Sequence, residues 1–449
     1  FALDKAYGTR EQYKEFIDEC HARGIAVIID VVYNHTTGAH PWARLYWNGS
    51  DNVSSNNPWY NVVTPHGFGV YQDLNHANEM VKNHINESLK YLIDEYHVDG
   101  FRFDGVTSML YYSHGLGEAF CGYGDYYNGH QDDEAIAYLT LANLLIHEVN
   151  PKAITIAEEV SGMPGLAAPF EDGGYGFDYR LAMNIPDYWI KTIKECKDDE
   201  WDIMKLWYEL TIRRAKEKNI GYAESHDQAL VGGKTFFFQL ADKEIYWGMR
   251  KDQENLIVER AIALHKMARL ATFALNGGAY LNFMGNEFGH PEWIDFPREG
   301  NGWSFHYCRR QWSLKNNGYL KYEWLDKFDK DMVAMAKKHK VIGGQDKQLL
   351  VHNSDNVLVY KKGGATFVYN FDPTRSYDGY LIPVAEEGNY QVILSTDDHC
   401  YGGFGRIWHQ TYTATKQPDG RIGFQVYLPQ RTAIVLKKLA KKAKKTAEK

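Results

Sequence analysis

Short apolar runs rich in β-branched residues alternate with longer amphipathic segments over the first two-thirds of the chain. Residues 24–30 form a mostly apolar run that predicts a buried parallel strand, and residues 10–23 before it have helical spacing. A second helix is predicted over 80–96 and a second strand over 98–104. The same theme returns in three more predicted strands, at 153–158, 219–227 and 279–286. Because strands that alternate with helices form a parallel sheet covered by helices, a (β/α)8 TIM-type barrel is the leading candidate at this length.

The pattern changes near residue 347, where short strands separated by Gly, Asp and Asn turns replace the long helical segments. The clearest of these strands are at 357–360, 366–371 and 432–436. Many short strands with turn residues between them predict an antiparallel β-sandwich. We therefore expect an α/β catalytic barrel over residues 1–345, an all-β sandwich domain over 346–437 and a basic, solvated tail over 438–449.

Polar residues stand at the end of each predicted barrel strand, or directly after it. They are Asp30, Asn34, His35, Arg102, Asp104, Glu158, His226 and Asp227. The carboxyl ends of barrel strands are where barrel enzymes carry their active sites. A retaining glycosidase needs a carboxylate nucleophile and a second carboxyl group that first donates and then accepts a proton. A third carboxylate would stabilise an oxocarbenium-like transition state, so this set of residues predicts a glycosidase-like site.

Four short segments resemble the signature regions of the α-amylase superfamily, and they occur in the order of that family. They read DVVYNH at 30–35, GFRFD at 100–104, IAE at 156–158 and SHD at 225–227. The resemblance to this superfamily (glycoside hydrolase family 13) implies a retaining double-displacement mechanism. It implies Asp104 as nucleophile, Glu158 as general acid/base and Asp227 as transition-state stabiliser.

Residues next to these carboxylates are expected to affect their ionisation and their orientation. Arg102 lies two residues before Asp104, so both side chains share one face of the strand and the guanidinium would keep the carboxylate ionised. Asp30 is expected to orient its neighbours at the sugar site. Glu159 competes with Glu158, but adjacent strand residues point to opposite faces, and the family pattern selects Glu158. Because Glu158 must be protonated when it acts as an acid, its surroundings are expected to raise its pKa.

Further residues are candidates for contacts with the substrate. The resemblance implies that His35 and His226 hydrogen-bond hydroxyl groups of the transferred sugar. Gln228 is a candidate contact to the donor or acceptor glucan. Three aromatic residues beyond the strands are also candidates, although plain packing explains them equally well; they are Trp293, Trp303 and Tyr307.

Between residue 100 and about residue 437 the resemblance narrows to glycogen- and starch-branching enzymes. The distinctive stretches are 104–111, 158–164, 176–183, 222–232 and 281–293. This resemblance implies a glucanotransferase of glycogen biosynthesis that cleaves α-1,4-glucan and rejoins it as an α-1,6 branch. A sugar 6-hydroxyl would attack the glycosyl-enzyme on Asp104 in place of water, with Glu158 as base. The expected partner is an α-glucan, namely glycogen, amylose or amylopectin.

The first quarter of the chain, residues 1–99, resembles bacterial α-amylases more than branching enzymes. In α-amylases the position of Asn34 often helps to bind calcium, so Asn34 is a calcium candidate, and no other cofactor is expected. The strand that ends at Asp30 corresponds to the third barrel strand of the family. We therefore expect a barrel without its first two strands, with exposed strand edges and low stability.

Composition narrows the class of protein. The net charge of −8 does not favour a nucleic-acid partner. The 12 Trp, 32 Tyr and 21 Phe residues suit a large core and also the stacking of rings on sugars. The five cysteines are scattered, which argues against disulfides and a zinc site. No apolar stretch is long enough to span a membrane and no signal peptide is recognisable, so a cytoplasmic location is expected.

Two other functions remain open from the sequence. An endo-acting α-amylase would share the three carboxylates, and the first quarter of the chain favours it. An inactive glucan-binding fragment is the other alternative, and the missing barrel strands favour that reading. Product linkage separates branching from hydrolysis, and an Asp104→Asn substitution separates either reaction from binding alone.

Overall fold

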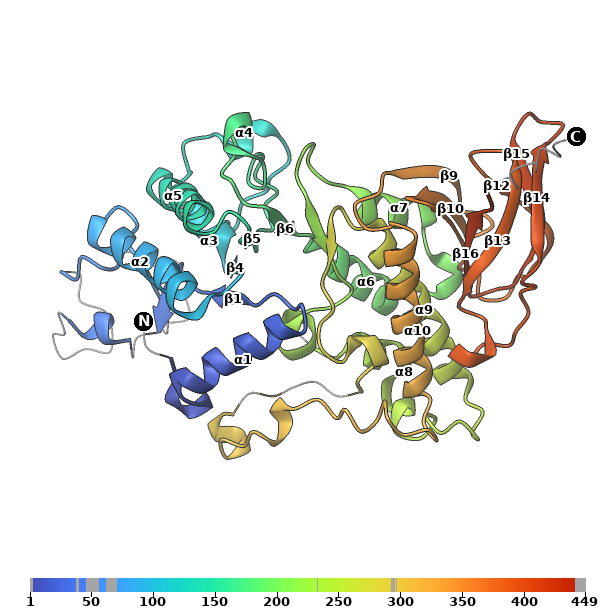
Figure 1. Ribbon diagram of the computed structural model, residues 1–449, viewed down its shortest axis with the longest axis horizontal. Coiled ribbons are helices and arrows are strands. Elements are labelled where there is room, and N and C mark those ends of the chain that lie inside the picture. The colour runs from blue at the N-terminus through green and yellow to red at the C-terminus, as the bar shows by residue number, and fades with distance from the viewer. Residues whose placement is uncertain are drawn as a thin grey trace, which may run out of the picture. The chain divides into compact units, whose positions relative to one another are not determined.

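The computed structural model describes residues 3–37, 40–45, 56–61, 71–231, 233–291, 295 and 297–440. The chain divides into two compact units (Figure 1). Unit 1 consists of Phe1–Leu181 and Arg213–Asn219, and unit 2 consists of Ala182–Ile212 and Ile220–Lys449. Within the described residues, no helix is both long enough and apolar enough to cross a membrane.

Unit 1 is built on parallel strands whose carboxyl ends lie at one edge. The described parallel strands of unit 1 are hydrogen-bonded to one another in the order β1 (Ile28–Val31), β4 (Gly100–Phe103), β5 (Ile154–Ala157) and β6 (Tyr179–Leu181). The register places Asp30 opposite Arg102, and Arg102 opposite Ile156. Neighbouring strands therefore end nearly level with one another, and the residues that follow them meet at the same edge.

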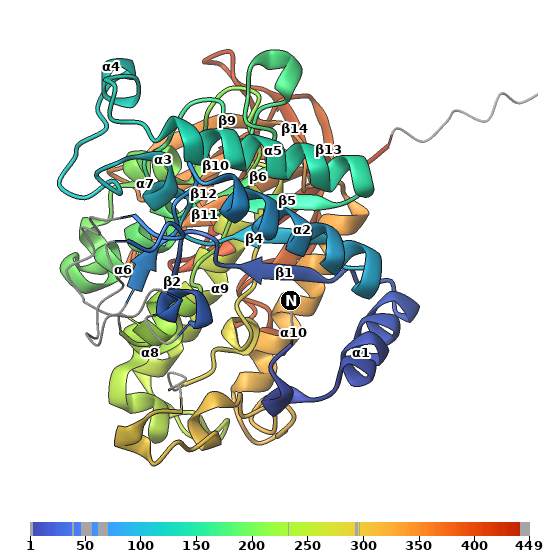
Figure 2. The same cartoon turned by 90° about the vertical axis from the view of Figure 1, so that its left-hand side faces the viewer.

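Helices pack along this sheet because their apolar positions recur at helical spacing. α2 (Glu79–Tyr96) begins at Asn78, whose side chain accepts a hydrogen bond from the Met80 N–H. It buries residues four positions apart, namely Val81, Ile85, Leu89 and Ile93. α5 (Asp133–Val149) begins in the same way, at Asp132. Figure 2 shows α2 and α5 running alongside β1, β4 and β5.

The remaining helices and strands of unit 1 are shorter or lie at its rim. They are α1 (Arg10–Ala22), β2 (His35–Thr37), β3 (Tyr71–Asp73), α3 (Val106–Leu110) and α4 (Tyr123–Tyr126). β2, which follows β1 closely in the chain, forms an antiparallel pair with β3. α1 carries a capping box between Thr9 and Gln12, which satisfies backbone N–H groups at its start. The helices predicted over 10–23 and 80–96 are therefore confirmed.

Unit 2 combines a short parallel strand pair with helices. β7 (Asn219–Gly221) pairs with β8 (Ala279–Tyr280), with Ile220 opposite Ala279. α9 (Leu256–Leu275) is buried over most of its length, which its largely apolar sequence permits. The other helices are α6 (Asn184–Glu195), α7 (Ile203–Thr211), α8 (Phe236–Ala241) and α10 (Tyr322–Lys338).

The C-terminal part of unit 2 is an eight-stranded antiparallel sheet with the order β12-β15-β14-β13-β16-β11-β10-β9 (Figure 1). The strands are β9 (Asp346–His352), β10 (Val357–Lys362), β11 (Ala365–Asn370), β12 (Tyr377–Pro383), β13 (Gly388–Ser395), β14 (Thr411–Lys416), β15 (Ile422–Leu428) and β16 (Thr432–Lys438). The runs predicted at 357–360, 366–371 and 432–436 fall on β10, β11 and β16. The predicted antiparallel module is therefore confirmed.

The neighbouring strands β16, β11 and β10 of this sheet are buried on both faces. In β10, Val357 and Val359 belong to an apolar core that also contains residues of β12, β14 and β15. Leu358 and Tyr360, which alternate with them, belong to a second core shared with α9 and α10. Strands from both ends of the sheet order line the first core. The sheet therefore folds over on itself as a sandwich, while its other face joins the helices.

The predicted barrel strands are present as parallel strands, but they are shorter than predicted. The strand predicted over 24–30 begins only at Ile28, and the strand predicted over 219–227 ends at Gly221. β6 lies where the apolar pattern predicts no strand, because three residues are too few for a periodic signal. Lys438, predicted to begin the tail, instead ends β16 opposite Tyr390. Residues 441–449 lie outside the described residues.

Candidate active site

Arg102 connects three carboxylates at the carboxyl ends of β1, β4 and β5. Its Nη1 donates hydrogen bonds to Asp30 Oδ1, at 2.9 Å, and to Asp104 Oδ1. Its Nη2 lies 3.2 Å from Glu158 Oε1, and the Arg102 side chain is only 12% exposed. The strand register explains this grouping, since Asp30 lies opposite Arg102 while Asp104 and Glu158 directly follow β4 and β5. The structure thus brings together four of the predicted site residues.

The three carboxylates secure the positive charge of Arg102. Burial lowers the pKa of the guanidinium, but the negative charges of Glu158, Asp30 and Asp104 outweigh this effect and raise the pKa above its ordinary value. A guanidinium in turn favours the ionised form of a carboxylate beside it. The predicted role of Arg102 beside a nucleophilic carboxylate stays a prediction.

Glu158 and Glu159 point to different surroundings. Glu158 Oε2 accepts a hydrogen bond from the Gly105 N–H at 2.7 Å, next to Asp104. The Glu159 side chain is fully buried, and it accepts hydrogen bonds from the N–H groups of Ser161 and Gly162 at 2.6 and 3.0 Å. Only Glu158 therefore shares the edge with Asp104, as the alternation of side chains predicts. The raised pKa expected for Glu158 stays a prediction.

Asn34 and His35 lie beside the same strand ends. Gly105 follows Asp104 with a φ of 64°, and a Cβ at this glycine would lie 3.5 Å from the Cβ of Asn34. Asn34 is buried, with its Nδ2 at 3.0 Å from His35 Nδ1. Across the described residues, no three His, Cys, Asp or Glu side chains are grouped as a metal site would require. A calcium site at Asn34 therefore stays a prediction.

In unit 2, the turn after β7 carries His226, Asp227 and Gln228. Gln228 Oε1 accepts hydrogen bonds from the backbone N–H and the hydroxyl of Ser225, both at 2.9 Å. The Ser225 hydroxyl in turn accepts from the Asp227 N–H at 3.2 Å. His226 Nε2 lies 3.4 Å from Asp227 Oδ1, and both side chains are partly exposed. Gln228 thus closes the turn that presents His226 and Asp227, while its contact with glucan stays a prediction.

A buried ion-pair network lies behind the loop after β5, and no sequence pattern predicts it. Arg180 Nη1 lies 3.4 Å from Glu159 Oε2, and Arg180 Nη2 lies 3.1 Å from Glu217 Oε2. Glu217 also accepts hydrogen bonds from the N–H groups of Gly165 and Ala167 at 2.8 and 3.2 Å. The network fixes the loop that follows Glu158. Its three charged residues lie far apart in the sequence, so no spacing could have grouped them.

Glu224 holds the turn of unit 2 in a similar way. It is buried, and it accepts hydrogen bonds from Asn286 Nδ2 at 2.9 Å and from the Phe236 N–H. Burial raises the pKa of Glu224. The carboxyl group therefore joins the turn after β7 to the start of α8 and to the loop after β8. Its position directly before the SHD motif is the one sequence signal that could have indicated it.

Of the three aromatic candidates for substrate contacts, the structure describes the side chain of Trp303 alone. Trp303 is exposed and has a φ of 58°. Trp293 and the side chain of Tyr307 lie outside the described residues. The roles suggested for all three stay predictions.

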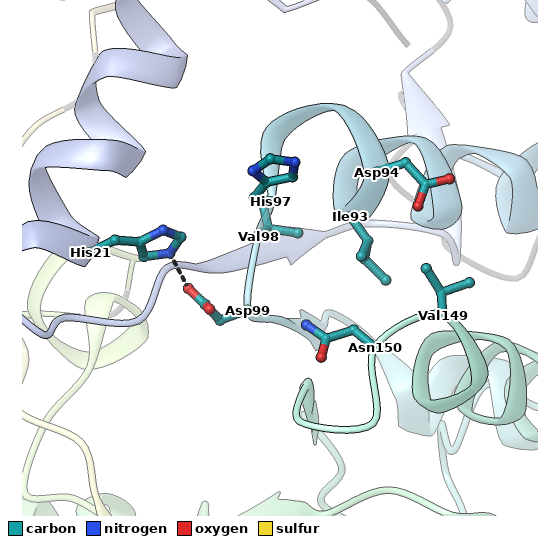
Figure 3. A pocket seen from close by; sticks show the side chains of 8 residues that line it. All are labelled: His21, Ile93, Asp94, His97, Val98, Asp99, Val149 and Asn150. Atoms are coloured by element: carbon teal, nitrogen blue, oxygen red, sulfur yellow. Dashed lines mark hydrogen bonds and ion pairs between the residues drawn. The ribbon is translucent and has the colours of Figure 1, made fainter.

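A hollow of about 410 Å³ lies at the opposite end of the unit 1 strands (Figure 3). Asp99, in its wall, directly precedes β4; its Oδ2 lies 2.8 Å from His21 Nε2 and accepts a hydrogen bond from the Val27 N–H at 2.6 Å. His97 and Asn150, which also line the hollow, precede β4 and β5. These residues tie α1 to the amino ends of the strands and stand apart from the predicted site.

Two family models match the chain. The model described as "Alpha amylase, catalytic domain" matches residues 1–71 and 66–295. The model described as "Alpha amylase, C-terminal all-beta domain" matches residues 350–438. The two matches cover the parallel α/β part and the antiparallel sheet in the order that the sequence predicts.

Curated proteins named 1,4-alpha-glucan-branching enzyme are similar over nearly the whole chain. The protein of Yarrowia lipolytica is 44% identical over 97% of this chain and 65% of its own length. That of Aspergillus oryzae is 45% identical over 97% and 64%, and that of Solanum tuberosum is 44% identical over 94% and 49%. The chain thus spans less than two thirds of each relative. Because they cover 97% of the chain, the first two alignments extend into residues 1–99, whose expected likeness to bacterial α-amylases stays a prediction.

Among solved structures, an alpha-amylase from Geobacillus thermoleovorans, complexed with acarbose, has a similar fold. It aligns with a TM-score of 0.63 over 98% of this chain and 83% of its own, at 16% sequence identity. At this identity the likeness concerns the fold. It agrees with the predicted class, a barrel-type catalytic region followed by an antiparallel all-β domain.

Proposed function

The chain belongs to the α-amylase family, and on this premise we propose that it is a glucanotransferase that cleaves α-1,4-glucan and forms α-1,6 branches. The similarity to curated 1,4-alpha-glucan-branching enzymes over 97% of the chain supports this assignment. The structural observation that carries it is the group formed by Arg102 with Asp104 and Glu158. This group supplies the two carboxyl groups of a retaining mechanism at one sheet edge.

In the first step of the proposed reaction, the Asp104 carboxylate attacks the anomeric carbon of the donor glucan. The bond from this carbon to the glycosidic oxygen breaks, and Glu158 gives its proton to the departing oxygen. The negative charge of Asp227 stabilises the oxocarbenium-like transition state. The step leaves a glycosyl group bonded to Asp104 and an ionised Glu158, which the hydrogen bond from the Gly105 N–H stabilises.

In the second step, Glu158 takes the proton of a 6-hydroxyl on the acceptor glucan. The oxygen of this hydroxyl attacks the anomeric carbon and displaces the Asp104 carboxylate. Two displacements at one carbon retain the α configuration, so the new linkage is α-1,6. Because water in place of the acceptor would give hydrolysis, transfer requires that the bound acceptor excludes water.

The other site residues orient these groups in the proposed mechanism. Asp30 holds Arg102 through the 2.9 Å hydrogen bond between Asp30 Oδ1 and Arg102 Nη1. His35 and His226 would donate or accept hydrogen bonds at the sugar hydroxyls, and Gln228 shapes the turn that presents His226. The proposed substrate is glycogen, amylose or amylopectin. The proposed location is the cytoplasm, which the five free cysteines suit.

Proton NMR of amylose incubated with the protein tests the proposed reaction. We expect α-1,6 anomeric signals to rise without matching new reducing ends. Asp104→Asn should lower the rate by about 10⁴-fold or more, because the nucleophile is lost. Asp94→Asn is the control, since Asp94 is exposed and pairs with Lys90 on the surface of α2.

Other outcomes of this experiment assign the other functions. New reducing ends without α-1,6 signals would establish hydrolysis, the α-amylase alternative. No turnover in the parent protein, combined with retained glucan binding, would establish the binding-only alternative. Either result overturns the proposed branching activity.

A further inference from the structure

A column of aromatic rings runs through unit 1 beside the loop that follows β5. The ring centres of Tyr111 and Phe120 lie 4.8 Å apart, and those of Phe120 and Tyr126 lie 5.4 Å apart. Arg214 continues the column, with its guanidinium carbon 5.2 Å from the ring centre of Tyr126 and 5.6 Å from that of Tyr123. Tyr111 and Tyr126 are buried, so the inner part of the column belongs to the core.

Arg214 also attaches this column to the loop that follows Glu158. Its Nε and Nη2 donate hydrogen bonds to the Gly162 carbonyl at 3.0 and 2.8 Å. The Tyr126 hydroxyl donates to the neighbouring Ser161 carbonyl at 2.9 Å. Ser161 and Gly162 lie three and four residues after Glu158, the proposed acid/base. A ring held by Arg214 therefore has a defined position relative to that residue.

Tyr123 is the outer end of the column, and much of its side chain is open. The residue is 66% exposed although the Arg214 guanidinium lies over its ring. A cation placed over an aromatic face is an attractive contact that holds the ring in place. A ring that is held on one side and open on the other loses little freedom when a ligand stacks on it. Tyr123 is thus a preorganised platform that Arg214 connects to the loop that follows Glu158.

We propose that the open side of Tyr123 binds a glucosyl unit of the α-glucan, away from the bond that is cleaved. This proposal rests on the proposed function, which supplies the class of ligand. The faces of a pyranose ring carry C–H groups and match a flat aromatic ring, while the phenol hydroxyl can exchange hydrogen bonds with sugar hydroxyls. A stable protein interface buries about 800 Å² per partner, far more than the open side of the Tyr123 ring offers.

Affinity electrophoresis in gels that contain amylopectin measures binding without turnover. The experiment uses the Asp104→Asn protein, so that the glucan is not consumed. Adding Tyr123→Ala should raise the Kd for amylopectin about three- to tenfold, the range expected for one aromatic stacking contact. Tyr123→Phe keeps the ring and should stay within about twofold, on the same reasoning. Tyr123→Leu keeps apolar bulk without a flat ring and should behave like Tyr123→Ala.

Tyr127→Ala is the matched control for this experiment. Tyr127 directly follows α4 and is 58% exposed, but among the described residues Arg214 covers only the rings of Tyr123 and Tyr126. Replacing Tyr127 should leave the Kd within about twofold of the Asp104→Asn value, because the ring of Tyr127 is not held by Arg214. Thermal melting of each variant confirms that the fold is retained. In the active protein, Tyr123→Ala should raise the KM for amylose more than it lowers kcat.

The proposal is overturned if Tyr123→Ala and Tyr127→Ala change the Kd equally. It is also overturned if Tyr123→Phe loses as much affinity as Tyr123→Ala, since a stacking site depends on the ring and not on the hydroxyl. The gel measurement shows whether Tyr123 binds glucan even if product NMR shows hydrolysis, because branching and hydrolysis use the same α-glucan. Failure of the branching activity and failure of the Tyr123 site are therefore distinguishable.

Discussion

Arg102 is the residue on which the proposed chemistry depends most directly. Its guanidinium contacts the carboxylates of Asp30, Asp104 and Glu158. Carboxylates this close together would repel one another when ionised, in the absence of a positive charge between them. Because their attraction for Arg102 outweighs the cost of burying it, the pKa of the guanidinium is raised. Arg102 is thus both the counter-charge of the carboxylates and the group that orients them.

Substitution of Arg102 by Met should separate this role from simple folding. We expect kcat for branching to fall by about 10²- to 10³-fold, the range for loss of one preorganised charged donor at a reacting centre. Asp30→Asn removes only one partner of Arg102 and should cost less than about tenfold, because the contacts to Asp104 and Glu158 remain. Arg23→Met is the control, since Arg23 pairs with Glu19 on the exposed end of α1.

Steady-state kinetics on amylose decides this prediction. A kcat for Arg102→Met within about tenfold of the parent value would contradict the prediction. It would show that catalysis does not depend on the Arg102 guanidinium as a charged hydrogen-bond donor. A similar loss for Arg23→Met would instead indicate a general effect on the fold.

At the scale of an element, α9 carries a buried amine that ties it to the loop after β13. Lys266 Nζ donates hydrogen bonds to the carbonyl groups of Thr396 and Tyr401 at 2.5 and 2.7 Å. Burial lowers the pKa of Lys266 from 10.5 to about 7, although the acidic groups of Asp397, Asp398 and Cys400 act in the opposite direction. The connection between α9 and this loop therefore contains an amine that is half protonated near neutral pH.

This pKa predicts a pH dependence of stability between pH 7 and pH 9. Over that range the unfolded chain keeps the proton on Lys266, whereas the folded protein loses it. Since the unfolded state binds more protons, the free energy of unfolding rises with pH, by about 2 kcal/mol from this group. Lys266→Met should remove that rise. Lys327→Met is the control, because Lys327 is half-exposed and pairs with Asp331 on α10.

Guanidinium chloride unfolding at pH 7 and pH 9 measures the effect. The prediction concerns the difference between the two pH values, so a uniform loss of stability in Lys266→Met does not affect it. If the parent and Lys266→Met proteins gain or lose equal stability between the two pH values, the lowered pKa is wrong.

At the scale of the whole molecule, the C-terminal sheet shares a hydrophobic core with the helices of unit 2. Residues of β10, β11 and β16 lie in one core with residues of α6, α7, α8, α9 and α10. The opposite face of the same strands belongs to the core inside the sandwich. Apolar burial on both faces explains why every residue of β11 is buried. The predicted domain boundary at residue 345 thus separates segments of the chain that share one core.

Substitutions on opposite faces of the sheet should therefore destabilise the protein to a similar degree. Leu358→Ala opens a cavity toward the helices, and Ile434→Ala opens one inside the sandwich. Each should cost about 2–5 kcal/mol, the range for large-to-small changes in a core. Tyr427→Ala should cost less than about 1 kcal/mol, because Tyr427 is partly exposed on β15 and leaves a smaller cavity.

Chemical unfolding followed by tryptophan fluorescence measures these costs. Both core substitutions should shift the same transition, since one sheet lines both cores. A loss for Ile434→Ala without a loss for Leu358→Ala would mean that the face toward the helices contributes little, and that the all-β module folds as a separate unit.

Much of the fold and part of the site were accessible from the sequence. The alternation of apolar and polar positions depends on local backbone geometry, so it predicted the order of the strands and the polar residues at their ends. It also predicted that Glu158 and Glu159 point in different directions. It overestimated the length of β7 and missed β6, because strands of three residues give no reliable period.

What only the tertiary structure decided is which distant residues meet. The sequence by itself determined the α/β class, the antiparallel C-terminal module and the carboxylates at the strand ends, because each follows from short-range spacing. The pairing of Arg180 with Glu159 and Glu217 depends instead on contacts between segments far apart in the chain. So does the attachment of Arg214 to the loop after β5. A charged group that is removed from water needs a partner. Only the folded chain brings such partners into contact.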